Sequence, residues 1–471
     1  MILLDIVIAM KHELMIGFII FLLLFWKIRS DEPNPALVIS AVNGLLLATV
    51  MLFLFGSKEV MLFNNMFKGN ELILFQKTVL SLGMLILSAV SISWLKNNKN
   101  FLEFYILLLS SLLGMFFMIS SANLLMFYLG LELSTIPLAA AANFDLQKKK
   151  SSEAAMKLIL SSAFSSALTL LGISFIYGST GTLLFSEISI SLVENPLSIY
   201  AFILILAGFA FKISAVPFHL WTADVYEGAP IPVTAFLSVV SKAAVTFVFV
   251  SVLFKVFQSL ALTWTIAISV LALLSIVVGN LFALRQQNIK RFLAFSAIAQ
   301  VGYILVAMLG SAEVVQSSIF FFLLTYLFAN LAAFGVIGII SEQTGKESID
   351  DYKGFYQTNK FLSWVLAIGL FALAGVPPTA GFFGKFFLLL SGASKGNYIL
   401  IIIAALNMVV SFYYYLRIVK VIFMDSNNQP IVKTEAGLIP NLALLLCMAG
   451  LIILSIYGPI YEYIVHIVQP N

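Results

Sequence analysis

Residues 198–220 read SIYAFILILAGFAFKISAVPFHL, and this stretch contains the features that decide the fold. A helix needs about 20 apolar residues to cross the hydrocarbon core of a bilayer, and the stretch has that length and character. It also holds a lysine, Lys212, and a proline, Pro217. Proline removes a backbone donor and breaks a helix, which a membrane tolerates where protein or trapped water satisfies the freed groups. The stretch therefore predicts a broken membrane helix that carries a buried charge.

The composition of the whole chain is typical of a membrane protein. Of its 471 residues, 61% are hydrophobic and 10% are charged, and the mean hydropathy is +1.05. A soluble domain usually has about 25% charged residues. The net charge of +4 is spread over loops, so no basic patch favours nucleic acid as a partner. The single cysteine, Cys447, forms no internal disulfide or iron–sulfur site, and no Cys/His cluster suggests a metal.

Apolar runs between polar segments predict an all-α, polytopic membrane protein with about 14 transmembrane helices. The expected spans lie near residues 3–26, 36–55, 72–95, 101–119, 122–142, 154–177, 198–220, 230–254, 261–284, 292–310, 315–340, 361–389, 398–422 and 437–457. The fourth and fifth spans are separated only by Ser120 and Ser121. No small-residue cleavage site follows the first run, so we expect it to stay in place as a span.

Two of the spans are interrupted by proline, at positions that suggest internal symmetry. The seventh span carries Pro217, and the twelfth carries Pro377 and Pro378. A five-helix unit repeated five spans later has the opposite orientation, which is the arrangement of an inverted repeat. We therefore expect four segments: an N-terminal three-helix segment (1–100), a first five-helix repeat (101–260), a second, inverted five-helix repeat (261–422) and a C-terminal helix (423–471).

The basic residues in the loops predict the orientation of the chain. Loops after odd-numbered spans hold sixteen: Lys27, Arg29, Lys96, Lys99, Lys148, Lys149, Lys150, Arg285, Lys290, Arg291, Lys346, Lys353, Lys360, Arg417, Lys420 and Lys433. The opposite side holds five: Lys11, Lys58, Lys68, Lys255 and Lys395. This asymmetry places the first set in the cytoplasm and both termini on the outer side.

The remaining five basic residues lie inside predicted spans. Lys77 and Lys157 are within a turn or two of a span start, where a long side chain can reach the interface. Lys212, Lys242 and Lys385 lie deeper. A charge at the centre of a membrane helix costs on the order of 2.5–3.5 kcal/mol even on the mildest scale. These three lysines therefore require a compensating interaction or a function.

Among the 22 acidic residues, Glu132 is the one expected deep inside a span. A structural explanation pairs Glu132 with Lys212 and lets Lys242 and Lys385 reach the interface. It explains poorly why three buried lysines accompany one buried acid. Burial disfavours the charged form of a lysine, and a nearby carboxylate favours it, so such residues can exchange protons. We therefore favour a proton relay.

Four further residues near these spans have two interpretations each. His219 follows the break and either passes protons between Lys212 and Lys242 or is a loop histidine that bonds a carbonyl. Asp224 and Glu227 are interpreted as loop acids, with a proton-collecting role as the alternative. Lys157 either modulates Glu132 or reaches the interface.

Several motifs resemble the antiporter-like membrane subunits of respiratory complex I, the proton-pumping NADH:quinone oxidoreductase. They are residues 129–133 (LGLEL), 211–221 (FKISAVPFHLW), 224–230 (DVYEGAP), 288–291 (NIKR), 374–377 (AGVP) and 381–386 (GFFGKF). The resemblance runs from about residue 100 to 420, with the motifs in the family's order and spacing. It is strongest to the N-type members, because the M-type members are expected to have glutamate at the position of Lys385.

This resemblance implies roles, partners and a location. Glu132 and Lys212 would form the input pair, Lys242 the central relay and Lys385 the connection to the exit. The flavin, the iron–sulfur clusters and the quinone would belong to other subunits, with no cofactor in this chain. The expected partners are M-type and small membrane subunits, the lateral helix of an L-type subunit, lipids and protons. The expected location is a bacterial inner membrane, with both termini periplasmic.

Two other classes of protein share parts of this pattern. One comprises subunits of multi-subunit cation/proton antiporters and of membrane hydrogenases, in which the same machinery is expected. The other is a structural membrane subunit that moves no ions. A carrier of organic solutes is disfavoured, because its buried polar groups would converge on one cavity rather than be distributed among four spans.

Overall fold

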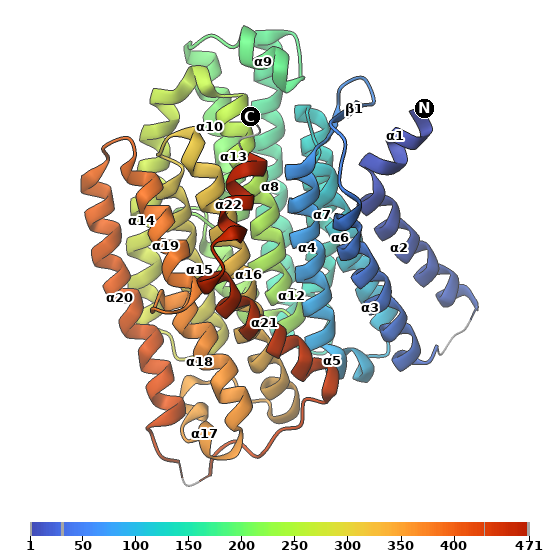
Figure 1. The fold of residues 1–471 in the computed structure, drawn as a ribbon, viewed down its shortest axis with the longest axis vertical. Coiled ribbons are helices and arrows are strands. Elements are labelled where there is room, and N and C mark those ends of the chain that lie inside the picture. The colour runs from blue at the N-terminus through green and yellow to red at the C-terminus, as the bar shows by residue number, and fades with distance from the viewer. Residues whose placement is uncertain (1, 30–32, 428, 469–471) are drawn as a thin grey trace.

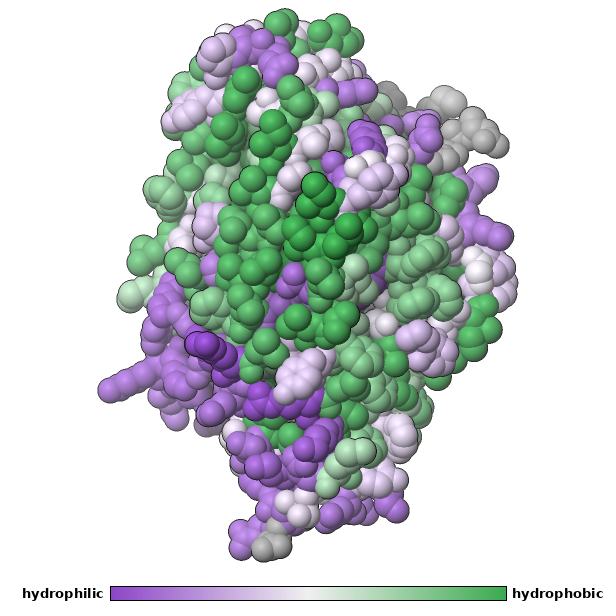
Figure 2. Space-filling view, turned by 90° about the vertical axis from the view of Figure 1, so that its left-hand side faces the viewer, coloured by the Kyte–Doolittle hydropathy of each residue, from purple (hydrophilic) through white to green (hydrophobic). Residues whose placement is uncertain are grey.

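The computed structural model describes residues 2–29, 33–427 and 429–468, and most of this part of the chain is helical. The long helices run roughly side by side along the longest axis of the molecule (Figure 1). The β1–β2 hairpin and α9 lie at the upper end in this view, and α5 and α17 lie at the lower end. The apolar side chains cover the middle of the face in Figure 2, and hydrophilic side chains gather towards the lower end. This distribution is the one that a bilayer requires.

The first part of the chain contains both strands. Its elements are α1 (Ile2–Ala9), α2 (Lys11–Arg29), α3 (Pro35–Met51), η1 (Leu52–Phe55), β1 (Val60–Leu62), β2 (Phe67–Gly69), α4 (Glu71–Val90) and α5 (Ile92–Asn97). The strands pair antiparallel, with Met61 opposite Lys68.

The middle of the chain contains the first interrupted helix. Its elements are α6 (Phe101–Ile119), α7 (Leu124–Ala142), α8 (Lys149–Thr180), α9 (Phe185–Ser191), α10 (Pro196–Ile213), α11 (Leu220–Gly228), α12 (Ile231–Phe236), the π-helical segment η2 (Leu237–Ser241) and α13 (Lys242–Lys255).

The last part contains the second interrupted helix. Its elements are η3 (Gln258–Leu260), α14 (Ala261–Arg285), α15 (Ile289–Ala307), α16 (Ala312–Thr344), η4 (Ile349–Tyr352), α17 (Phe355–Thr358), α18 (Lys360–Ala374), α19 (Ala380–Ala393), α20 (Tyr398–Phe423), α21 (Leu438–Ile456) and α22 (Pro459–Val468).

Twelve helical stretches in the described residues are long and apolar enough to cross a membrane, and each coincides with one predicted span. The predicted span 361–389 is instead divided between α18 and α19, which are shorter apolar helices. The predicted span 3–26 is divided between α1 and α2. The fourth and fifth spans are separate helices, α6 and α7. The total of fourteen spans and the inverted repeat stay predictions.

Asparagine side chains begin three of the helices that later form the site. Asn123 accepts backbone N–H bonds at the start of α7, and Asn195 does so at the start of α10. Asn288 accepts the backbone N–H groups of Lys290 and Arg291, at 2.9 and 3.2 Å, and so begins α15. Such caps satisfy N–H groups that have no partner within the helix. They fix where each helix starts, and therefore which residues reach the interior.

The two predicted breaks are confirmed. After α10 the backbone leaves the helix at Ser214, which is left-handed (φ 66°), and α11 begins six residues later. After α18 it leaves at Gly375, with φ 86°, and α19 begins at Ala380. A positive φ at Gly375 avoids the steric cost that a side chain would add there. Each break therefore leaves irregular backbone next to a buried lysine, Lys212 or Lys385.

The interpretation of Lys77 as an interfacial side chain is wrong. Lys77 Nζ lies 2.5 Å from Glu13 Oε1, and both side chains are 2% exposed. The same pair shows that Glu132 is not the only acid deep inside the fold. An ion pair removed from water compensates part of the cost of burying each charge, whereas a single partner left behind is uncompensated.

We predict that Glu13→Gln or Lys77→Met, each alone, destabilises the detergent-solubilised protein by about 3–5 kcal/mol, because each leaves a buried charge unpaired. The double substitution should recover most of this loss. Thermal unfolding in detergent measures the effect, with Lys353→Met, which removes an exposed ion pair with Asp350, as the control. Equal stability of both single variants and the wild type would show that the pair is not what fixes α2 to α4.

Candidate functional site

The four ionisable residues predicted to form a relay lie on four different spans. Glu132 is on α7, Lys212 on α10, Lys242 on α13 and Lys385 on α19. Lys242 is 3% exposed and Lys385 is 1% exposed, whereas Glu132 and Lys212 are partly buried. The prediction that Lys242 and Lys385 are removed from the surface is therefore confirmed, but their role as a relay stays a prediction.

Glu132 and Lys212 form no direct ion pair within 4 Å in the described structure. Lys212 Nζ donates a hydrogen bond to the hydroxyl of Thr135, which lies about one turn after Glu132 on α7. Glu132 Oε1 is buried and has no hydrogen-bond partner among the described residues. Close contact of α6 and α7 helps to place Glu132, since a Cβ at Gly130 would lie 2.6 Å from Met118 N.

A small cavity lies beside Lys212 and extends to the helix of Lys242. Its volume is about 20 Å³, and its lining includes Thr135, Lys212, Trp221 and Ser241. One water molecule needs at least about 10–15 Å³ of such volume and two or more polar partners. Ser241 immediately precedes Lys242, so the cavity is a place where one water molecule can connect the surroundings of the two lysines.

Lys242 has the fewest polar contacts of the three lysines. Its Nζ is buried without a hydrogen-bond partner among the described residues, and it lies 5.6 Å from the centre of the Tyr226 ring. An ammonium at this distance is attracted by the face of an aromatic ring. Lys242 follows the π-helical segment η2, a distortion that frequently occurs at functional sites.

Lys385 is held at the second break. Its Nζ donates to the carbonyl of Ala374 at 3.2 Å and lies 5.2 Å from the centre of the Tyr303 ring. Ala374 is the last residue of α18, so its carbonyl has no partner from a continuing helix. A Cβ at Gly375 would lie 3.1 Å from Lys385 Cδ. The break therefore supplies both an acceptor and space for this lysine.

Uncharged polar side chains are also buried in the part of the bundle that contains Lys242 and Lys385. The hydroxyls of Ser238 and Tyr326 are 3.4 Å apart, and Ser238 lies one turn before Lys242. Gln300 Nε2 donates to Tyr415 Oη at 3.4 Å. Asn280 Nδ2 donates to Tyr303 Oη at 3.4 Å and Asn280 Oδ1 accepts from Tyr414 at 2.8 Å. Sequence reasoning missed these residues because a lone tyrosine or amide in an apolar run has no distinguishing charge.

A network of four ion pairs surrounds α11. Arg291 Nη1 lies 2.7 Å from Asp224 Oδ1 and 2.8 Å from Glu227 Oε2. Lys157 Nζ lies 2.6 Å from Asp224 Oδ2, and Lys150 Nζ lies 2.7 Å from Glu227 Oε1. The interpretation of Asp224 and Glu227 as loop acids is wrong, because both belong to a helix. We call these five residues the ionic junction.

The ionic junction stabilises its two carboxylates. Partial burial alone would raise the pKa of Asp224, but hydrogen bonds from Lys157 and Arg291 lower it below the ordinary value. Partial burial would likewise raise the pKa of Glu227, but hydrogen bonds from Lys150 and Arg291 outweigh this effect and lower the pKa. Lys157 is thus bound to Asp224 and Glu153, and its proposed influence on Glu132 stays a prediction.

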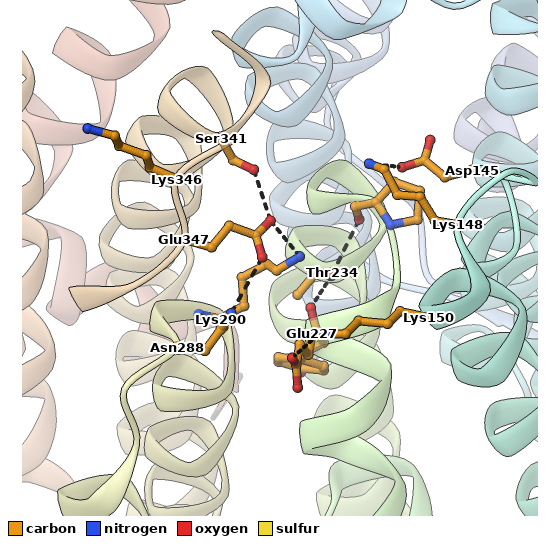
Figure 3. A network of polar contacts seen from close by, with 12 residues as sticks. Asp145, Lys148, Lys150, Glu227, Thr234, Asn288, Lys290, Ser341, Lys346 and Glu347 are labelled. Carbon is orange, nitrogen blue, oxygen red and sulfur yellow. Dashed lines mark hydrogen bonds and ion pairs between the residues drawn. The ribbon is translucent and has the colours of Figure 1, made fainter. Parts of the chain in front are cut away.

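An open cavity of about 460 Å³ adjoins the ionic junction. Figure 3 shows polar side chains from its lining, among them Lys150 and Glu227 of the junction. Its charged lining is Asp145, Lys148, Lys150, Glu227, Lys290, Glu342 and Glu347. Lys290 Nζ lies 2.9 Å from Glu347 Oε1, and Lys148 Nζ lies 2.8 Å from Asp145 Oδ2. Pro230–Pro232 and Ala235 also line it, so it reaches the helix that continues to Lys242.

His219 lies at the first break, directly before α11. It is partly buried, and its Nδ1 has no hydrogen-bond partner among the described residues. Its expected role between Lys212 and Lys242 stays a prediction. Within residues 2–29, 33–427 and 429–468, no group of three or more His, Cys, Asp or Glu side chains could hold a metal ion.

An apolar helical bundle with a lysine next to each of two broken helices is the arrangement of an antiporter-like membrane subunit. The model of the family described as NADH:quinone oxidoreductase/Mrp antiporter, transmembrane, matches residues 121–411. The chain belongs to this family.

Individual relatives cover most of the chain. It is 43% identical over 402 residues to the NADH-quinone oxidoreductase subunit N of Azobacteroides pseudotrichonymphae, which is 84% of each chain. It is also 43% identical over 409 residues to the subunit N of Phocaeicola vulgatus, covering 86% of this chain and 87% of that one. A chain of respiratory complex I from Thermus thermophilus has the same fold, with a TM-score of 0.82, 28% identity, and coverage of 96% and 98%.

We predict that the small cavity beside Lys212 binds one ordered water molecule. A high-resolution cryo-EM map should show it within hydrogen-bond distance of at least two polar atoms of Thr135, Lys212 or Ser241. Ser241→Val removes a polar partner and adds a methyl group, so it should abolish that density. Empty density in the wild-type map would contradict the assignment of this cavity as a connection between the lysines.

Proposed function

We propose that this chain translocates protons as the N-type membrane subunit of an NADH:quinone oxidoreductase, through a relay of Glu132, Lys212, Lys242 and Lys385. The relatives that carry the name subunit N support the identity of the complex. One structural observation supports the relay most strongly: Lys242 Nζ is buried with no hydrogen-bond partner among the described residues. A buried lysine without hydrogen bonds contributes little to the stability of the fold. A residue that must bind and release a proton, in contrast, requires that strong hydrogen bonds do not hold it in one protonation state.

The relay works through charge. A proton enters on Lys212, and the negative charge of a carboxylate such as Glu132 favours a charged lysine. Transfer to Lys242 breaks an N–H bond at Lys212 and forms one at Lys242, through water in the small cavity. The positive charge at Lys242 then disfavours a second proton on Lys212. Transfer of the proton to Lys385 through the hydroxyl and amide side chains returns Lys242 to its neutral form. Release of the proton from Lys385 completes one crossing.

The open cavity beside the ionic junction is the proposed entrance. It contains exposed charged groups, and its wall includes the start of the helix that carries Lys242. The end of the molecule with α5 and α17 then faces the bacterial cytoplasm, and both termini face the periplasm. Residues 101–260 form the input half and residues 261–422 the output half, between the N-terminal segment 1–100 and the C-terminal segment 423–471.

The driving reaction takes place in other subunits. In those subunits, electrons pass from NADH through flavin and iron–sulfur clusters to a quinone. This electron transfer changes the electrostatic field that acts on the ionisable residues of this chain. M-type and small membrane subunits, with the lateral helix of an L-type subunit, are the proposed partners. The 43% identity of this chain to two relatives named subunit N favours this assignment over an exchanger or a hydrogenase.

We predict that Lys242→Ala abolishes NADH-driven proton uptake through this chain and leaves the complex assembled. Pumping falls because the central proton acceptor is lost, and assembly persists because Lys242 Nζ makes no hydrogen bond to another of the described residues. Proton uptake and NADH oxidation in vesicles of the purified complex measure both effects. Lys255→Ala, an exposed lysine at the end of the same helix, is the matched control. Full proton uptake by Lys242→Ala would support a structural subunit instead.

A further inference from the structure

Helix α11 is held by its side chains rather than by a continuing backbone. It contains nine residues, Leu220–Gly228, and the irregular segment 214–219 separates it from α10. Its rotation about its own axis is therefore not set by the helix before it. Its polar contacts include the ionic junction, a hydrogen bond from Trp221 Nε1 to the carbonyl of Phe211 at 3.2 Å, and one from Thr234 Oγ1 to the carbonyl of Tyr226 at 3.2 Å. The helix also packs against α8 and α15.

In the ionic junction, Arg291 is the one cation that holds both carboxylates. It uses one oxygen of Asp224 and one of Glu227, while Lys157 and Lys150 take the other two. All four oxygens are thereby paired. Asp224 and Glu227 are three residues apart and share a helix face. Arg291 is on α15 and both lysines are on α8, so the junction holds α11 between these two helices.

Two other side chains of α11 lie against the proposed relay. Tyr226 is fully buried and presents its ring to Lys242 Nζ at 5.6 Å. Trp221 lines the small cavity together with Lys212 and Ser241. Tyr226 lies about 200° around the helix from Asp224, at 3.6 residues per turn. A rotation that moved the carboxylates would therefore also move the aromatic ring at Lys242.

We propose that Arg291 is a positioning residue for proton transfer: by binding Asp224 and Glu227 it fixes the rotation of α11, which holds the Tyr226 ring against Lys242. This inference rests on the proposed function in one respect, that Lys242 carries protons. It adds a connection between α15, in the output half, and the central lysine of the input half. Both contacts are made by Nη1 of Arg291. Arginine suits this role because the two N–H groups of that nitrogen have a fixed geometry in the planar guanidinium, whereas the ammonium of lysine is a point charge.

A double-mutant cycle in the assembled complex tests the connection. NADH-driven proton uptake and NADH oxidation are measured against pH in vesicles for Arg291→Met, Tyr226→Leu and the combined variant. Each single variant should lower proton uptake several-fold and move its pH profile to lower pH, because protonated Lys242 loses the ring that stabilises its charge. The combined variant should show no larger shift than Tyr226→Leu alone, because both changes remove the same contact.

Two further variants make the result specific. Arg291→Lys should restore part of the uptake and an intermediate pH profile, since one ammonium replaces one of the two ion pairs. Arg285→Met, which removes an exposed arginine at the end of α14 outside the junction, should match the wild type. If Arg291→Met does not assemble, Glu227→Gln takes its place in the cycle, with a smaller shift in the same direction.

Additive shifts in the combined variant, or a wild-type pH profile for Arg291→Met, would overturn the proposal. Its failure is separable from failure of the proposed function. Lys242→Ala tests whether the central lysine carries protons at all, whereas the cycle tests whether Arg291 acts on that lysine through Tyr226. Lost uptake in Lys242→Ala together with additive shifts in the cycle would reject only the positioning role.

Discussion

A lysine in the interior of a bilayer-spanning bundle lacks the water that would solvate its charge. Removing it from water costs on the order of 2.5–3.5 kcal/mol on the mildest scale. Beside the ion-paired Lys77, this chain places Lys212, Lys242 and Lys385 inside its bundle. The structure offsets the cost unequally. Lys212 has a hydroxyl partner, and Lys385 has a carbonyl and an aromatic ring. Within the described part of the chain, Lys242 has an aromatic ring nearby but no hydrogen-bond partner. Lys242, the lysine whose charge has the fewest stabilising contacts of the three, is the one at the centre of the proposed relay.

The interruptions of the helices follow from the same constraint. A continuous helix consumes its own backbone groups and offers none to a buried side chain. Ending α18 at Ala374 leaves a carbonyl free for Lys385, and ending α10 after Lys212 frees α11 to be placed by side-chain contacts. The π-helical segment before Lys242 is a third departure from regular helix. Each of the three lysines therefore lies next to a local irregularity, where polar groups or space become available.

Most of the fold was predictable because it depends on local patterns. Apolar length identified the spans, and proline identified both breaks. The position of Lys242 and Lys385 within apolar runs identified them as buried. The pairs that escaped prediction join residues far apart in sequence: Glu13 with Lys77, and Arg291 with the two acids of α11. Neither pair has a local signal, because each depends on how helices pack. The buried tyrosine and amide side chains were missed because a single uncharged polar residue in an apolar run does not stand out in the sequence.

The central claim is that the buried lysines exist for proton transfer and not for stability. The most direct test replaces all three by an apolar residue of similar length, Lys212→Met/Lys242→Met/Lys385→Met, together with Glu132→Gln so that no carboxylate loses its counter-charge, and measures melting temperature and NADH-driven proton uptake on the same purified complex. The account predicts an unchanged or higher melting temperature, because three costly charges are removed, together with loss of uptake through this chain. A lower melting temperature with uptake intact would contradict it, because the lysines would then be structural.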